Sequence, residues 1–556
     1  MIVLKFFVCC FVAVSATVAL AQSPDAGVEL SVASIDEAVV RGHIRFLADD
    51  LLEGRGPGSR GDALTQLYLA TQFQSMGLQP AGVEGGWTQP FPLIGVQTHC
   101  PPSITFRGQQ SVTFQYYDDY IATTGRPQAQ VEVTDAPLVF VGYGIQAPEY
   151  DWDDYKDVDV RGKILIMMNN DPADDPQLFE GKRRLYYGRW DYKYAMAAKM
   201  GAAGAFIIHT EASAGYPYQV VQTSWSGEES ELADEGQPRT NVRGWLTEDA
   251  AKKLMSSVNL DLDDLRAQAQ KSSFRPVELP TKLSVELTAE VRENNTANVL
   301  AMLEGSDPER EDEYVIFMAH HDHIGIASQR SEDGDNIYNG AIDNASGTAA
   351  LLAIARACTQ LPQRPRRSIL FVAVGAEEQG LLGSKFFAAN PTVPPGKMAA
   401  VVNIDGVNRI GRTHDVNMIG MGKSSLDEIV KQVAQLQNRI VTPDHFPDRG
   451  YYYRSDQFSL AKIGVPGIYL HSGVNVIGKP EGWGKQQLDR WVKEDYHQPS
   501  DEYAEDWDLS GAIEDIRLLY RAGLRIADDD AMPSWNPGDE FEAARKQAIA
   551  ETQPGS

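Results

Sequence analysis

Apolar residues recur at helical spacing in two segments near the start of the chain, residues 35–52 and 62–76, which predicts two helices joined by a glycine-rich turn. From about residue 130 to residue 285 the pattern changes to short apolar strands around one helix of small residues at 192–200. The polar stretch at 224–240 is expected to be a loop. The first half of the chain therefore contains a helical segment followed by a segment made mainly of short strands.

From about residue 295 the pattern becomes regular, because apolar strands alternate with amphipathic helices. Strands are predicted at 314–319, 368–374, 399–404 and 465–470, and helices at 345–359, 379–389, 425–437 and 510–527. This alternation predicts an α/β fold with a mixed, mostly parallel central sheet flanked by helices. The polar residues after Pro533 are expected to form a loosely held tail.

Composition and charge restrict the partners. With 43% hydrophobic residues, 48 glycines and 30 prolines, the chain has the composition of a folded globular protein. Its 77 acidic and 50 basic residues give a net charge of −27, which argues against nucleic acid as a partner. A peptide or another small substrate remains possible.

The first residues have the pattern of a secretory signal peptide. Lys5 precedes an apolar run that ends in Ala19-Leu20-Ala21, with small residues at the positions that a signal peptidase requires. We therefore expect cleavage after residue 21 and export to the periplasm or the medium, with no integral membrane segment afterwards. The mature chain keeps Cys100 and Cys358, which are expected to be unpaired.

Histidines and acids follow several of the predicted strands. They are His320, His321, Asp322 and His323 after the first strand, Asp343 before the long helix, Glu377 and Glu378 after the second strand, Asp405 after the third, and His497 late in the chain. Ligands bind beyond the carboxyl ends of strands in such sheets, and burying like charges together requires a compensating cation. Imidazole and carboxylate without thiolate suit zinc or another divalent metal.

The period of a strand sorts the histidine-rich run into two pairs. Alternate residues share a face, so His320 is paired with Asp322, and His321 with His323. Asp322 could accept the free N–H of His320 and so orient the ring. The second pair has no such acid. The spacing favours His320 as a ligand but leaves the other pair open.

Several motifs together resemble those of the co-catalytic zinc exopeptidases, which include bacterial leucyl aminopeptidases and glutamate carboxypeptidases. They are Ala319-His320-x-Asp322-His323, Asn339-Gly-Ala-Ile-Asp343-Asn-Ala-Ser-Gly347, Ala376-Glu377-Glu378-x-Gly-Leu-Leu-Gly-Ser384, Asn403-Ile-Asp405, Arg454-Ser-Asp456 and Tyr496-His497-x-Pro-x-Asp501. The motifs occur in the order that the family has.

The resemblance implies a site with two Zn²⁺ ions and a role for each residue. One ion would be held by His320, Asp343 and Asp405, and the other by Asp343, Glu378 and His497, so that Asp343 bridges the two. Glu377 would be the general base and Asp322 the orienting acid. A tyrosine could assist at the oxyanion, with Tyr453 and Tyr496 as the candidates.

The middle region resembles a protease-associated domain, through Asp159-Val-Arg-Gly-Lys-Ile-Leu-Ile166 and the helix that begins near Lys193. The expected organisation is then a signal peptide at 1–21, an N-terminal peptidase segment at 22–129, a protease-associated insertion at 130–285, the main peptidase segment at 286–532 and a polar tail at 533–556.

Two positions depart from the family pattern. Ile342 and Gln457 stand where relatives often have an aspartate and a histidine. Neither is a metal ligand in the family, but Gln457 puts details of substrate contact in question.

The expected activity is removal of N-terminal residues from peptides with a free N-terminus, since no arginine cluster stands out for carboxylate binding. The alternatives are a carboxypeptidase of the same family, a glutaminyl-cyclase-like enzyme with a single zinc, and a binding module without catalysis.

Overall fold

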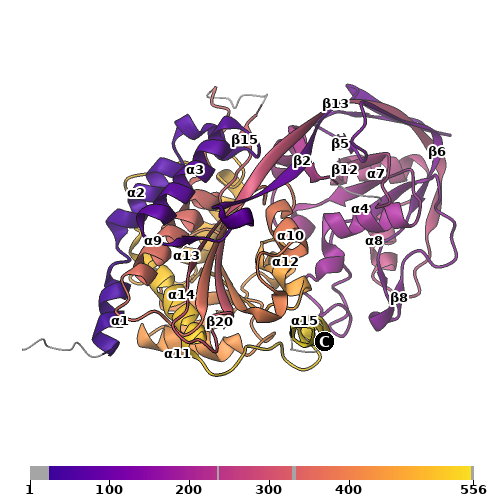
Figure 1. The fold of residues 1–556 in the computed structure, drawn as a ribbon. Helices are drawn as coiled ribbons and strands as arrows, with labels where there is room; N and C mark the ends of the chain where they lie inside the picture. Colours follow the sequence, from indigo (N-terminus) through magenta and orange to yellow (C-terminus); the bar gives the residue numbers. More distant parts are fainter. Residues whose placement is uncertain (1–23, 234–236, 328–333, 553–556) are drawn as a thin grey trace, which may run out of the picture.

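The main sheet has the strand order β1–β13–β17–β14–β18–β21–β19–β20 (Figure 1). Neighbours among β17, β14, β18 and β21 are parallel, as are β19 and β20. The other pairings are antiparallel. The bounds are β1 Gln79–Pro80, β13 Val277–Leu303, β14 Tyr314–His320, β17 Ser368–Val374, β18 Met398–Asn403, β19 Asp415–Ile419, β20 Ile440–Pro443 and β21 Gly467–Ser472. The mixed, mostly parallel sheet predicted from the sequence is confirmed.

The computed structural model describes residues 24–233, 237–327 and 334–552. The expected signal peptide at 1–21 lies outside the described residues. Within them, no helix is both long enough and apolar enough to cross a lipid bilayer.

The central strands read as unbroken apolar runs because both faces of the sheet are covered. In β14, Val315 and Phe317 belong to the hydrophobic cluster that includes α9 and α14, whereas Ile316 and Met318 belong to the cluster with α10 and α12. The helices of this part are α1 Pro24–Ala33, α2 Glu37–Leu47, α3 Arg60–Ser75, α9 Gly347–Thr359, α10 Leu382–Ala389, α11 Leu426–Leu436, α12 Gln457–Lys462, α13 Trp483–Glu494 and α14 Ser510–Asp528. Helical layers therefore enclose the sheet, as Figure 1 shows.

A second unit has its own sheet, in the order β5–β12–β10–β9–β6–β13–β3–β4. Its elements are β3 Ser103–Gly108, β4 Val112–Gln115, β5 Tyr120–Thr124, β6 Gln130–Phe140, β9 Ile164–Met168, β10 Gly204–His209, β12 Val242–Thr247, α4 Trp190–Lys199, α5 Glu211–Ala214, α6 Tyr218–Trp225, α7 Glu248–Ser257 and α8 Leu262–Ala269. Ile104 and Phe114 lie in the same hydrophobic cluster as Val131 and Leu287. The packing of this unit therefore begins before residue 130, where the sequence placed the boundary.

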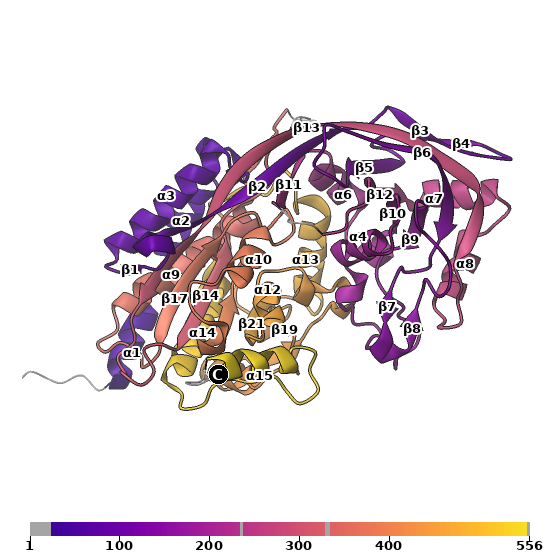
Figure 2. The same ribbon diagram turned by 45° about the vertical axis from the view of Figure 1, so that its right-hand side comes forward.

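One strand joins the two units. β13 pairs with β6 over residues 277–288, with β2 (Thr88–His99) over 288–299, and with β17 over 299–303. Figure 2 shows β13 arching from one unit to the other. Two further pairs of short strands, β7 Gln146–Ala147 with β8 Trp152–Asp153 and β15 Gly325–Ile326 with β16 Ile337–Tyr338, form small separate sheets.

Two segments differ from the prediction. The predicted loop at 224–240 contains β11 Glu228–Leu232, which pairs with β2. β11 contains three glutamates, so the sequence lacks the apolar pattern from which a strand is predicted. Charged side chains are common in strands at the edge of a sheet. The tail expected to be loose contains α15 Glu542–Glu551 and buries Trp535 and Phe541. The Arg545 guanidinium is also buried and donates to the carbonyl of Met398 at 2.8 Å, which fastens the tail.

Cys100 and Cys358 are both free thiols, as expected. Cys358 is buried on α9 within the main hydrophobic cluster, and burial raises the pKa of its thiol. This position explains the residue as a core side chain.

The contact between α14 and β14 generates a stability prediction. A Cβ atom on Gly523 would lie 2.2 Å from Cζ of Phe317, whose side chain is fully buried. We expect Gly523→Ala to lower the free energy of unfolding by about 1–3 kcal/mol, because the ring has no space to move. Gly42→Ala in α2 is the matched control, since nothing lies within 4 Å of its added Cβ. The control should gain about 0.5–1 kcal/mol of stability. Denaturant unfolding measures both, and equal effects of the two would contradict the packing described.

Candidate active site

Three adjacent parallel strands bring the predicted ligands together at their carboxyl ends. β14 lies between β17 and β18. His320 is the last residue of β14, Glu377 and Glu378 follow β17, and Asp405 follows β18. The loop before α9 supplies Asp343, and the loop between α13 and α14 supplies His497.

The first group surrounds His320, which is 1% exposed. Its Nε2 lies 3.2 Å from Oδ1 of Asp343 and 3.5 Å from Oδ1 of Asp405. The potential ligand atoms of these three residues lie within 4.8 Å of one another. The set is the one that the resemblance assigned to one metal ion.

The second group surrounds Glu378. Nε2 of His497 lies 3.0 Å from Oε2 of Glu378 and 3.4 Å from Oδ2 of Asp343. Asp343 thus turns one carboxylate oxygen toward each histidine, as a bridging ligand does. His323 also reaches this group, with Nδ1 2.6 Å from Oε1 of Glu378. The strand period left the pair of His321 and His323 without an acid, so the approach of His323 was missed.

The buried imidazoles show that the cluster suits cations. Nε2 of His320 and of His497 forms no hydrogen bond among the described residues, although carboxylate oxygens lie 3.0–3.5 Å away. Burial alone would lower the pKa of His497, but the carboxylates of Glu378 and Asp343 raise it to about 10. The carboxylates thus favour positive charge at the imidazoles. Divalent ions would supply that charge instead and displace the protons.

The two adjacent glutamates have different environments. The Glu378 carboxylate contacts His323 and His497, and although burial opposes it, these neighbours lower its pKa to about 2. The Glu377 carboxylate forms no hydrogen bond or ion pair among the described residues and faces the cavities beside the cluster. Burial and the charge of Glu378 raise the pKa of Glu377 well above its usual value. The Glu378 carboxylate is thus held by its neighbours, whereas the Glu377 carboxylate is free to contact a group in the cavity.

Asp322 acts on the backbone rather than directly on His320. Its Oδ1 lies 3.7 Å from Nδ1 of His320, which is too long for the hydrogen bond expected from the strand period. The carboxylate instead accepts the backbone N–H groups of Glu377 at 3.0 Å and Glu378 at 3.3 Å. Asp322 therefore holds the loop that carries both glutamates.

Other residues position the ligands and were not assigned a role from the sequence. The Asp501 carboxylate accepts the backbone N–H of Asp343 at 3.1 Å, and the Ser455 hydroxyl donates to Asp405 at 2.6 Å. The buried Arg55 guanidinium donates to the carbonyls of His321, Asn339, Gly340 and Leu47. Burial lowers the pKa of Arg55 to about 10, so it stays charged. All three residues lay in quoted or glycine-rich motifs, but the motifs did not reveal these contacts.

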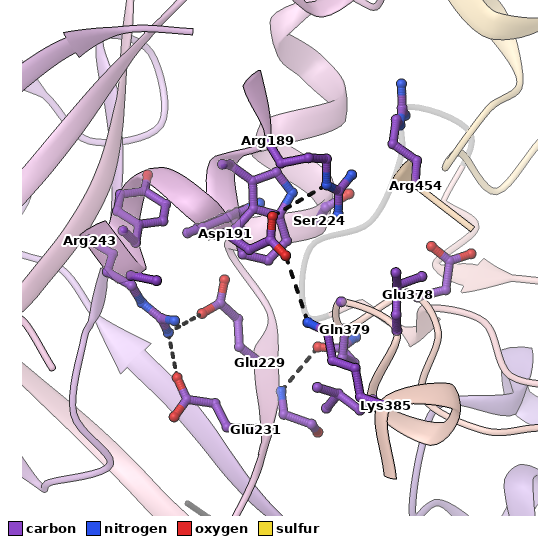
Figure 3. Close-up of a pocket in the computed structure, with 18 of the residues that line it drawn as sticks. Arg189, Asp191, Ser224, Glu229, Glu231, Arg243, Glu378, Gln379, Lys385 and Arg454 are labelled. Atoms are coloured by element: carbon purple, nitrogen blue, oxygen red, sulfur yellow. Dashed lines mark hydrogen bonds and ion pairs between the residues drawn. The ribbon is translucent and has the colours of Figure 1, made fainter. Parts of the chain in front are cut away.

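The second unit forms one wall of the site. A cavity of about 670 Å³ is lined by Glu377, Glu378 and His497 on one side and by residues of α4, β11 and β12 on the other. Figure 3 shows Glu378 and Arg454 opposite Arg243, Glu229 and Glu231. From α6, the Ser224 hydroxyl lies 3.0 Å from Nδ1 of His497. The second unit therefore contacts a candidate metal ligand directly.

The remaining candidates separate clearly. Tyr496 stacks beside His497, with ring centroids 3.9 Å apart, and lines the cavities. Tyr453 instead packs in the core and donates to Glu540 at 2.8 Å. Gln457 is buried and accepts a hydrogen bond from Asn403, so it is a structural residue. Ile342 lines a second cavity of about 170 Å³.

The contact of Ser224 generates a prediction on metal retention. If Nε2 of His497 binds the metal, Nδ1 carries the proton and donates it to Ser224, which fixes the ring. We expect Ser224→Ala to weaken the zinc affinity by about 10-fold or more. Zinc content measured after dialysis against a graded chelator series tests this. Ser226→Ala is the control, because it removes a nearby hydroxyl that does not reach His497. Unchanged affinity in Ser224→Ala would show that this bond does not position the ligand.

Part of the chain is similar to known peptidases. Residues 298–520 match the model of peptidase family M28. Over 117 residues the chain is 39% identical to aminopeptidase NAALADL1 of Rattus norvegicus, and over 190 residues it is 30% identical to the probable glutamate carboxypeptidase LAMP1 of Arabidopsis thaliana. These alignments cover 20% and 33% of this chain, and only 13% and 24% of the two relatives.

A solved structure extends the likeness of the fold to most of the chain. The aminopeptidase from Aneurinibacillus sp. strain AM-1 superposes with a TM-score of 0.53 at 18% sequence identity, and the match covers 92% of this chain and 97% of that one. The region that matches the family model carries all of the ligands proposed above. Residues 298–520 of the chain are therefore similar to peptidase family M28.

Proposed function

We propose that the protein is a two-zinc exopeptidase that removes N-terminal residues from peptides. One observation carries the proposal: Asp343 lies between two histidine–carboxylate groups, and an unpaired carboxylate, that of Glu377, stands beside them at the cavity. The family supports peptide hydrolysis. The choice of the N-terminus rests on the rat relative, which is named an aminopeptidase.

The residues of the chain divide the work of hydrolysis. When bound, zinc ions supply a Lewis acid for the scissile carbonyl and lower the pKa of a water molecule from about 15.7 toward 7. Glu377 accepts the proton of the attacking water and passes it to the leaving amine. Glu378 cannot do this, because its carboxylate is engaged with His323 and His497. Tyr496 offers a hydroxyl at the cavity for the developing oxyanion.

Peptides with modified ends test the proposed function. We expect purified enzyme to cleave pentapeptides with a free N-terminus, with or without a C-terminal amide, and to leave N-acetylated peptides intact. A chelator should abolish the cleavage and added zinc should restore it, because the ligands hold the ions reversibly. Product analysis by mass spectrometry identifies the released residue. Cleavage of N-acetylated but not C-amidated peptides would instead establish a carboxypeptidase.

The roles of the two glutamates can be tested separately. Glu377→Gln should keep both zinc ions and lower kcat by about 10²–10⁴-fold, because it removes only the base. Glu378→Gln should instead lose zinc. Metal content and steady-state kinetics on the same preparations give both readouts. Activity close to wild type in Glu377→Gln would remove this residue from the mechanism.

We also infer that the chain is exported and that the second unit is a protease-associated domain. The segment before Gln22 supports export. Mass spectrometry of protein recovered from the periplasm or medium should find Gln22 as the first residue. Retention of residues 1–21 in that fraction would contradict the cleavage.

A further inference from the structure

Arg454 is an arginine beside the reaction centre that no carboxylate of the described residues pairs with. Its guanidinium lies over the rings of Tyr216 and Tyr451, 5.3 and 5.6 Å from their centroids. Its one hydrogen bond is a long one of 3.4 Å to the hydroxyl of Tyr496. In the cavity of about 170 Å³ the other two arginines are paired, Arg409 with Asp495 at 3.4 Å and Arg449 with Asp489 at 2.8 Å. Arg454 therefore stands apart from its neighbours.

Its position lies where a substrate would be. Arg454 lines both the cavity of about 670 Å³, with Glu377 and His497, and the cavity of about 170 Å³, with Asp343 and Glu377. Tyr496 links the guanidinium to the ring of His497. A group bound to Arg454 would thus lie next to the bond that is cleaved.

The electrostatics favour an anion at this point. Two divalent ions would balance the carboxylates of Glu377, Glu378, Asp343 and Asp405, so Arg454 is not needed to neutralise them. The half-buried Arg454 has no acidic partner among the described residues, and the planar fork of its guanidinium matches a carboxylate with two parallel hydrogen bonds. The rings of Tyr216 and Tyr451 lie within cation–π distance of that guanidinium.

We propose that Arg454 is a specificity-determining residue that binds a carboxylate of the substrate; the inference rests on the proposed peptidase function. The carboxylate has two possible sources, the free C-terminus of a dipeptide or the side chain of an acidic N-terminal residue. The second unit takes part, because Tyr216, just before α6, packs against the guanidinium. The sequence contains no arginine cluster that would indicate such a site. Arg454 becomes a candidate only in the structure, where no carboxylate of the described residues pairs with it.

Paired substrates test the proposal and separate the two sources. Alanyl-alanine is compared with alanyl-alaninamide for the terminal carboxylate, and glutamyl with glutaminyl p-nitroanilide for the side chain. In at least one pair, Arg454→Gln should lower kcat/KM for the carboxylate-bearing member by about 10–100-fold, and for the neutral member by less than about 3-fold. Arg454→Lys should retain part of the preference, since the charge remains without the fork.

The matched control is Arg409→Gln, which removes a charge from the same cavity that is already paired with Asp495. It should not change the preference within either pair. Equal losses on acidic and neutral substrates in Arg454→Gln would mean that the guanidinium acts on the scissile group, and would overturn the proposal. An unchanged preference would also overturn it and leave Arg454 a packing residue.

A binding measurement separates this proposal from the proposed activity. Zinc-loaded Glu377→Gln and Glu377→Gln/Arg454→Gln proteins are titrated calorimetrically with alanyl-alanine, its amide, and glutamyl and glutaminyl p-nitroanilide. Tighter binding of a carboxylate-bearing compound that is lost in the double variant supports the site, even if the wild type hydrolyses none of them and the peptidase function fails. Equal binding of acid and neutral partners overturns the site, whatever the activity. Thermal unfolding of each variant verifies that it is folded.

Discussion

The candidate active site depends on one constraint: several acids and imidazoles are held together at one edge of the sheet, where water does not fully screen their charges. Parallel strands make the confinement unavoidable, because the loops that leave β17, β14 and β18 all emerge at the same side. Two features offset the resulting repulsion: histidines face the acids, and the buried guanidinium of Arg55 interacts with their charges. Divalent cations at this cluster would replace the protons of the imidazoles as the positive partners of the acids.

Main-chain contacts determine how accurately the ligands are placed. Arg55, Asp322 and Asp501 all direct their hydrogen bonds to backbone groups of the loops that carry the ligands. A hydrogen bond to the backbone fixes the position from which a side chain extends, and it does not use the polar atoms of that side chain. These three residues thus tie the segments that carry the candidate ligands to each other and to the N-terminal segment.

The parts that the sequence predicted share a local signal. A buried parallel strand is an apolar run, and a chemically active residue directly after it is visible in the same few letters, as with His320, Glu377 and Asp405. Features that depend on distant partners were not visible. Asp322 turned out to hold the backbone of another loop, and Ser224 contacts His497 across more than 270 residues. The charged strand β11 was missed because its partner, rather than its own pattern, makes it a strand.

The continuous strand β13 has a mechanical consequence. Its hydrogen-bonded ladder runs from β6 through β2 to β17, with register shifts only in the part that pairs with β6, between residues 279 and 285. Swinging one unit away from the other would require breaking backbone hydrogen bonds along a shared strand instead of bending a linker. The shared strand therefore couples the position of the second unit, which lines the cavity beside the candidate ligands, to the main sheet.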